Sequence, residues 1–158
     1  MIRSTTRCIL AVFFSLAFFG FGSSTDTHAA NSVQKPALIE ATLAGDLERV
    51  AHMLQSGVPV NSHDDHNNTA LTFAARDGQS EIARLLIAHG AQVNWQDDEK
   101  VTPLILAAFQ NYPEIVRILL AKGADPDIVD QWGRRAIDYA LRRGSADEIY
   151  LLLKERDP

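Results

Sequence analysis

The segment TPLILAAFQNYPEIVRILLAKGADPDIVD, residues 102–130, decides the fold, because the chain from Pro36 onward repeats its pattern. One constant shift along the chain brings glycines, alanines and one asparagine from distant parts of the sequence into register. The positions in register are Gly57, Gly90 and Gly123; Gly45, Gly78, Asn111 and Gly144; and Ala41, Ala74, Ala107 and Ala140. Self-similarity at such a fixed period predicts a solenoid, in which stacked repeats share one continuous core.

The repeated pattern has three parts, T-P-L-x-x-A-A, then E-I-V-R-x-L-L, then G-A-D-x-(N/D). It resembles the ankyrin repeat, and the resemblance covers about four copies. It implies an all-α solenoid, in which each repeat is a helix-turn-helix pair with a β-hairpin finger at right angles to the helices. The expected repeats are residues 36–65, 66–98, 99–130 and 131–158, of which the first and last act as caps.

The residues that begin and end the expected helices fit their positions. Thr102 is expected to start a helix with Pro103 at its first position, where the missing N–H has no intrahelical partner to lose. Gly78 and Gly90 suit a left-handed backbone at helix C-termini. Asn111 takes the place of a glycine at such an end, and asparagine is the best substitute at positive φ.

The fingers are expected in segments such as AQVNWQDDEKVT, residues 91–102. Their tips fall at Asn67, Lys100 and Gly133, where the resemblance implies a preference for glycine. Lys100 departs from that preference, and we expect the turn of its finger to be strained or of another type.

Two layers of apolar side chains are expected to form the core. Small residues in the first layer let the helices approach closely, since larger side chains would force them apart. These residues are Ala74, Ala75, Ala107 and Ala108. The second layer is expected at Leu85, Leu86, Ile118, Leu119, Leu151 and Leu152. As a terminal repeat, the first one is expected to present a more polar outer face, to which Glu40 and Glu48 contribute.

The segment at residues 1–30 has the layout of a secretory signal. Arg3 and Arg7 precede an apolar run at residues 8–21, and small and polar residues lead to Ala29 and Ala30, where we expect cleavage. This apolar run is shorter than the ~20 residues that a membrane-spanning helix needs. We expect a removed signal in preference to a retained N-terminal anchor, followed by a polar linker at residues 31–35 and a repeat domain at residues 36–158, with no membrane attachment after cleavage.

Charge and cysteine content restrict the function. The single cysteine, Cys8, lies in the expected signal, so the exported domain needs no disulfide and its core alone must hold the fold. Loss of the signal takes the formal net charge from −5 to about −6. Nucleic-acid binding is not expected from this balance, because proteins that bind phosphate backbones carry a basic face.

The sequence HDDH, residues 63–66, is the one local cluster of possible metal ligands. Asp64 recurs as Asp97 and Asp130, which assigns it to the turn chemistry of the fingers instead. The cluster also lacks the spaced ligand pairs of a structural zinc site. Because motifs of nucleophilic, zinc-protease and phosphate-binding sites are absent from the sequence, we expect no catalysis, metal or cofactor.

Aromatic and charged residues outside the repeat pattern are the candidates for partner binding. Trp132 at a finger tip is the favoured anchor, since tryptophan is enriched in interface hot spots, whereas Trp95 is equally suited to packing within the fingers. The acidic first half and basic last repeat of the expected groove would orient a partner. The residues expected to line the groove are Asp65, His66, Arg76, Asp77, Gln96, Asp98, Glu99, Phe109, Gln110, Gln131, Trp132, Arg134, Arg142 and Arg143.

These observations favour a monomeric, non-catalytic module that binds a partner protein in the periplasm, as an adaptor, a protector or an inhibitor such as an immunity protein. One alternative is a secreted effector that binds a protein of a host or neighbouring cell, because the resemblance implies a scaffold common in such proteins. A metal-dependent enzyme that uses residues 63–66 ranks last, since only that cluster supports it.

Overall fold

The computed structural model describes residues 36–144 and 146–155, and the expected signal and linker lie outside them. Eight helices follow one another in this part of the chain. They are α1 (Ala37–Leu43), α2 (Leu47–Gln55), α3 (Ala70–Arg76), α4 (Ser80–Ala88), α5 (Pro103–Gln110), α6 (Pro113–Ala121), α7 (Ala136–Leu141) and α8 (Glu148–Lys154). None of the helices in these residues is long and apolar enough to cross a membrane.

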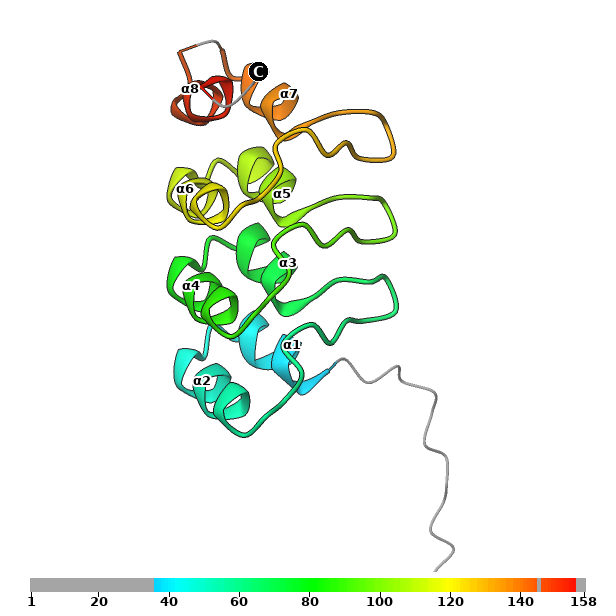
Figure 1. Cartoon of the computed structure of the whole chain (residues 1–158), viewed down its shortest axis with the longest axis vertical. Helices are drawn as coiled ribbons and strands as arrows, with labels where there is room; N and C mark the ends of the chain where they lie inside the picture. The colour runs from blue at the N-terminus through cyan, green and yellow to red at the C-terminus, as the bar shows by residue number, and fades with distance from the viewer. Residues whose placement is uncertain (1–35, 145, 156–158) are drawn as a thin grey trace, which may run out of the picture. The chain divides into compact units, whose positions relative to one another are not determined.

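The helices form a stack of four antiparallel pairs, as the resemblance predicted (Figure 1). Each odd-numbered helix packs on the next odd-numbered one, and the even-numbered helices form a parallel layer in the same way. The connections that follow α2, α4 and α6 extend away from both layers before they return to the next helix pair (Figure 1). The predicted all-α solenoid is therefore confirmed, and we call these connections the fingers.

The fingers are hairpin-like loops rather than the expected pairs of β-strands. In the described residues, the one β-bridge joins His63 to Thr69. Each tip is closed by one backbone hydrogen bond between residues four apart, such as Asp97 N to the carbonyl oxygen of Val101 at 3.2 Å. Neighbouring fingers are joined in the same way, because Gln131 N donates to the carbonyl oxygen of Glu99 at 2.9 Å. The fingers thus form one connected row without a regular sheet.

Of the two outcomes expected at Lys100, a turn of another type is wrong, whereas strain fits the positive φ of this non-glycine residue. Its φ is 59°, equal to that of Asn67 and close to the 73° of Gly133, so the three tips share a left-handed residue at one position. The carboxylate of Asp97 accepts hydrogen bonds from the backbone N–H groups of Glu99 and Val101 at 2.9 and 2.8 Å. These bonds hold the turn in place, so the tip tolerates a lysine at a positive φ that glycine would adopt at a lower conformational free energy.

Helix starts follow the repeat pattern in the second and third repeats and depart from it in the fourth. Thr102 Oγ1 accepts from Ile105 N at 3.3 Å, which confirms the predicted helix start, and Thr69 Oγ1 accepts from Thr72 N at the same distance in the second repeat. At the start of α7, Arg135 replaces the threonine, and its N–H donates to the carboxylate of Asp138 at 2.7 Å.

The core runs through all four repeats, and the alanine positions and Leu119 are fully buried as predicted. In the second layer the prediction is wrong for Leu151, which is 48 % exposed. Leu85 and Leu152 pack half-buried against the core, and on the last helix Ile149 and Leu153 are buried in it. Ile118, which precedes Leu151 by one repeat, is covered because α8 packs on α6. No further helix packs on α8 within the described residues, so the same position lies open.

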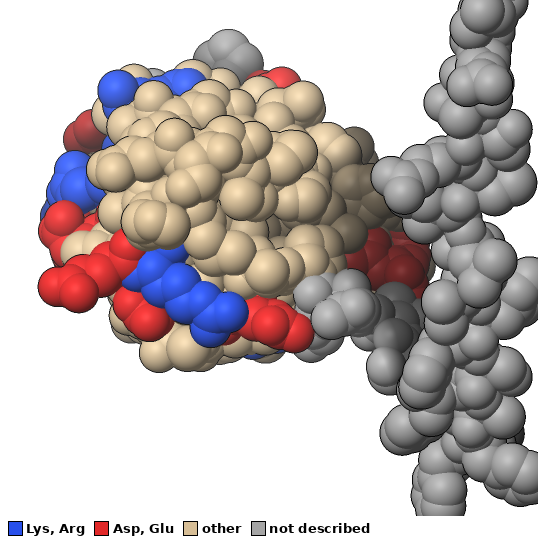
Figure 2. All heavy atoms as spheres, turned by 90° about the horizontal axis from the view of Figure 1, so that it is seen from below, with Lys and Arg blue, Asp and Glu red and all other residues tan. Residues whose placement is uncertain are grey.

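The first repeat presents a largely uncharged end. Figure 2 shows this end of the stack, where uncharged residues cover most of the visible surface and charged residues lie toward its edge. Glu40 and Glu48 are exposed, as predicted for a cap, while Leu43 and Leu47 are 36 % and 41 % exposed. The cap is therefore polar in part only.

Gly78 joins α3 to α4 at a point where a side chain of the next repeat passes closely. Its φ is +78°, and an added Cβ would lie 2.8 Å from the ring of Tyr112, whereas at Gly90, with φ +89°, nothing lies within 4 Å. We expect Gly90→Ala to lower the free energy of unfolding by about 1 kcal/mol and Gly78→Ala by about 1 kcal/mol more. Urea denaturation measures both, and equal losses would show that the Tyr112 contact is not tight.

Candidate interaction surface

A groove lies between the fingers and the odd-numbered helices and contains two adjoining hollows that share Glu99 and Leu106. The first has a volume of about 470 Å³ and the second about 300 Å³. The first hollow is lined by His66, Asn68, Thr72, Phe73, Arg76, Asp97, Asp98, Glu99 and Leu106. The second hollow is lined by Glu99, Val101, Ile105, Leu106, Phe109, Trp132, Arg134, Tyr139 and Arg142.

The helical side of the groove is formed by side chains one repeat apart. Phe73, Leu106 and Tyr139 occupy one such position on α3, α5 and α7, and Arg76, Phe109 and Arg142 occupy another one turn later. Phe73, Leu106 and Tyr139 were not predicted from the sequence as part of this surface. Their shared register from repeat to repeat was the signal that could have found them, because two of the three are aromatic at a position that varies between repeats.

The second hollow contains a stack of aromatic and guanidinium groups. The Arg134 guanidinium lies 4.5 Å from the centre of the Trp132 ring and 4.7 Å from that of Tyr139. Phe109 meets the Tyr139 ring edge-on, with 5.5 Å between ring centres and 83° between planes. Trp132 and Phe109 remain 57 % and 54 % exposed, so two large apolar surfaces face solvent beside positive charge.

Asp130 is buried, and its carboxylate holds the residues of this stack in place through hydrogen bonds. Its carboxylate accepts from Trp132 N at 2.9 Å, Arg134 N at 3.0 Å, Arg134 Nε at 3.2 Å and the Tyr139 hydroxyl at 2.5 Å. Burial alone would raise the pKa of Asp130, but the hydrogen bonds from Tyr139 and the two N–H groups outweigh it, and the pKa is lowered. Burial and the bond to Asp130 raise the pKa of Tyr139, so the pair stays carboxylate and phenol at neutral pH.

Arg142 lies at the open side of the same hollow. Its guanidinium is 5.4 Å from the centre of the Tyr139 ring. In residues 36–144 and 146–155 it makes no hydrogen bond or ion pair. Arg76 occupies the equivalent position two repeats earlier, but its guanidinium donates twice to Asp77, at 2.7 and 3.0 Å. The hydrogen bond from Arg76 to Asp77 raises the pKa of that arginine. The two hollows therefore differ in whether their arginine is already paired.

The first hollow is acidic, with Asp97, Asp98 and Glu99 at its finger side. Burial raises the pKa of Asp97 despite the bonds from Val101 and Glu99. His66 lies 4.0 Å from the Asp98 carboxylate and is exposed. The opposite charges of the two hollows agree with the polarity predicted along the groove.

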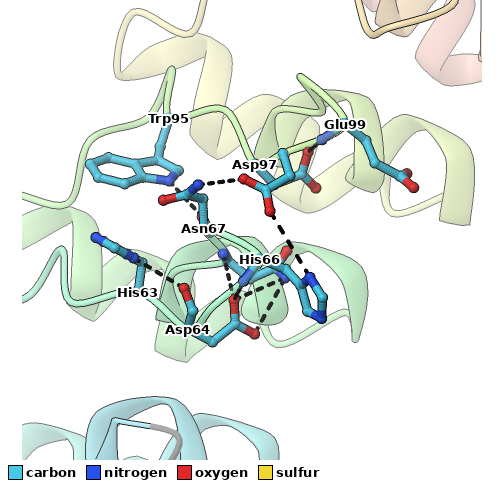
Figure 3. A network of polar contacts seen from close by, with 9 residues as sticks. His63, Asp64, His66, Asn67, Trp95, Asp97 and Glu99 are labelled. Carbon is cyan, nitrogen blue, oxygen red and sulfur yellow. Dashed lines mark hydrogen bonds and ion pairs between the residues drawn. The ribbon is translucent and has the colours of Figure 1, made fainter. Parts of the chain in front are cut away.

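Residues 63–66 serve the structure of their finger (Figure 3). Asp64 accepts from His66 N at 3.0 Å and Asn68 N at 2.8 Å, which confirms its predicted role in the turn. Trp95 lies across this finger, where its indole N–H donates to the carbonyl oxygen of Asn67 at 2.7 Å and its ring stacks on His63 at 5.6 Å. Within the part of the chain that the structure describes, no three His, Cys, Asp or Glu side chains gather closely enough to hold a metal ion.

Eight of the predicted interaction residues line the two hollows and six do not. Those that line them are His66, Arg76, Asp98, Glu99, Phe109, Trp132, Arg134 and Arg142. Those that lie outside them are Asp65, Asp77, Gln96, Gln110, Gln131 and Arg143.

Arg143 has partners within the chain, which explains its place outside the hollows. It donates to the carbonyl oxygen of Ala108 at 2.9 Å and to the Asp147 carboxylate at 2.9 Å, and so ties the end of α5 to the start of α8. Gln96 is engaged as well, because its amide donates to the carbonyl oxygen of Lys100 at 2.9 Å.

A helical solenoid with a row of fingers and a groove along one side is the architecture of a repeat scaffold whose variable side chains face the groove. A family model for ankyrin repeats, described as three copies, matches residues 38–130 and 90–158. The chain belongs to the ankyrin-repeat family, whose members are protein–protein interaction modules. A comparison with curated proteins found no match.

Proposed function

We propose that this chain is a non-catalytic binding protein that holds a partner protein in its groove, mainly at the second hollow. The observation that carries this proposal is the pair of exposed aromatic rings, Trp132 at 57 % and Phe109 at 54 %, beside a hollow of about 300 Å³. Large exposed aromatic side chains next to a pocket are typical of binding hot spots. Their desolvation by a partner would supply much of the binding free energy.

The setting of these rings supports a preformed site. Trp132 N is fixed to the Asp130 carboxylate at 2.9 Å, and its ring stacks on Arg134, which the same carboxylate holds. A side chain that is already held in place loses little conformational entropy when a partner binds. The second hollow is thus suited to a partner that inserts one apolar side chain between Trp132 and Phe109.

The proposed compartment is the periplasm, and this part of the proposal rests on the signal-like sequence of the N-terminal segment, 1–30. An exported domain without cysteine needs no disulfide there, which agrees with a fold held by one continuous apolar core. The proposed role is that of an adaptor, a protector or an inhibitor such as an immunity protein. Secretion to act on another cell is the alternative, and fractionation into periplasm and culture supernatant separates the two.

Capture of partners from a periplasmic extract tests the proposal. We expect the wild-type chain to retain a partner that Trp132→Ala retains at least about tenfold less, because the main aromatic anchor is removed. Leu151→Ala is the matched control, since Leu151 is 48 % exposed on α8 and does not line the groove. Equal recovery by wild type and Trp132→Ala would place the binding surface elsewhere.

A further inference from the structure

We propose that the second hollow recognises a carboxylate of its partner, carried by an aspartate or glutamate next to an apolar residue in an extended peptide segment. This inference rests on the proposed function and adds the chemistry of the partner. It is carried by two guanidinium groups, Arg134 and Arg142, which lie over the Tyr139 ring at the wall of a hollow whose other lining residues are apolar or aromatic apart from Glu99.

Arg134 is held so that only one edge of its guanidinium is available. Its guanidinium carbon lies over the Trp132 ring, 4.5 Å from the ring centre, and over the Tyr139 ring at 4.7 Å, and its Nε donates to the Asp130 carboxylate. In residues 36–144 and 146–155 neither terminal nitrogen makes a hydrogen bond. A planar donor edge that is fixed in this way matches the two oxygens of a carboxylate.

Arg142 supplies a guanidinium that no side chain of the described residues pairs directly. The Asp130 carboxylate already neutralises Arg134, whereas Arg142 has only the Tyr139 ring as a neighbour among its described contacts. The other charged residue of the hollow is Glu99 on the opposite finger. A partner carboxylate at Arg142 would give this guanidinium the ion-pair partner that no described residue supplies, beside apolar walls that strengthen the interaction.

The rest of the hollow selects the residue beside that carboxylate. Val101, Ile105 and Leu106 form an apolar floor, and Phe109 and Trp132 form the rim, so an apolar side chain fits next to the acidic one. The first hollow presents Asp97, Asp98 and Glu99, which favours a basic residue further along the same segment. Nucleic acid does not fit, because the chain carries a net charge of −5 and the acidic hollow adjoins the basic one.

Selection of random peptides on the full chain tests this chemistry without knowledge of the natural partner. We expect enriched peptides to carry Asp or Glu beside an apolar residue. Their affinity is then measured by fluorescence polarisation for wild type, Arg142→Gln and Arg49→Gln. Arg49 is exposed on α2, so its variant removes the same charge away from the groove.

Arg142→Gln is expected to lower the affinity for an acidic peptide by about tenfold, because one charge-assisted hydrogen-bond pair is lost. Arg49→Gln is expected to lower it by less than about twofold. Changing the acidic residue of the peptide to its amide should weaken wild-type binding equally and leave Arg142→Gln without further loss. Peptides without an acidic residue, or equal binding by Arg142→Gln, would overturn the carboxylate site.

A Trp132→Ala arm separates this inference from the proposed function. If selected peptides lose binding in Trp132→Ala but show no preference for acidic residues, the groove binds and the carboxylate inference is wrong. If no peptide is enriched, or if every enriched peptide binds Trp132→Ala as well as wild type, both the inference and the assigned surface are wrong. Circular dichroism of each variant confirms that the helices are intact.

Discussion

Leu119→Ala is expected to lower the free energy of unfolding by about 2–5 kcal/mol. Leu119 is fully buried on α6, which packs against both α4 and α8, so the cavity would open in the middle of the array. The loss combines the transfer free energy of the removed methyl groups with the cost of a cavity that rigid neighbours cannot close.

Urea and thermal denaturation measure this effect. Leu151→Ala is the control, because Leu151 is 48 % exposed on the last helix and its removal should cost less than about 1 kcal/mol. The same deletion of methyl groups is thus tested inside and outside the core. A loss below about 0.5 kcal/mol for Leu119→Ala would mean that the repeats are not packed in the register described.

Asp130→Ala is expected to cost about 3 kcal/mol or more, because it removes the acceptor of four hydrogen bonds at a buried position. The Tyr139 hydroxyl and the backbone N–H groups of Trp132 and Arg134 would lose their partner. Asp97→Ala is the matched control at the same position of the preceding finger. The Asp97 side chain accepts from only two backbone N–H groups in the described residues, so about 1–2 kcal/mol is expected.

The pH dependence of Asp130→Asn provides a second measurement. The pKa of Asp130 is lowered on folding, so its carboxylate stabilises the fold above the ordinary aspartate value of about 3.9, and this contribution is lost as the pH falls through the lowered pKa. The difference between wild type and Asp130→Asn should therefore be largest at neutral pH and shrink below about pH 4.

Asp97→Asn should behave in the opposite sense. Burial raises the pKa of Asp97, so its contribution is most favourable at low pH and is lost as the pH rises through that raised value. The difference between wild type and Asp97→Asn should grow as the pH falls. Parallel curves for the two variants would contradict the hydrogen-bond account of Asp130.

The repeated features of the fold could be predicted from the sequence. A residue type that recurs at a fixed period meets the same local structural requirement in each repeat. Glycine at positions that require positive φ, threonine at N-caps and alanine between helix layers each satisfy a constraint within one repeat. Asn111, at φ 66°, meets the same constraint as the glycines it replaces. The turn type at Lys100 was not predicted, because its positive φ is held by the hydrogen bonds to the Asp97 carboxylate and not favoured by the lysine itself.

Burial in the last described helix and the arrangement of side chains in the groove depend on contacts between repeats, which the repeat pattern does not specify. Leu151 follows the leucine register, yet its burial would need a covering helix beyond α8. In the groove, Trp132 could be proposed from its type and position alone. The contact of Arg134 with both the Trp132 and Tyr139 rings could not be predicted, because it joins a finger to a helix through a shared buried carboxylate.

The second hollow is built from two repeats, since Glu99 to Phe109 belong to the third and Trp132 to Arg142 to the fourth. Within the described residues the fourth repeat has a neighbour on one side only, and a repeat in that position is the first to fray in a linear array. A ligand in this hollow contacts both the third and the fourth repeat and therefore stabilises the packing of the fourth repeat on the third. Its measured affinity includes the free energy of closing the C-terminal end, and occupancy should slow hydrogen exchange in α7 and α8 before it affects α1.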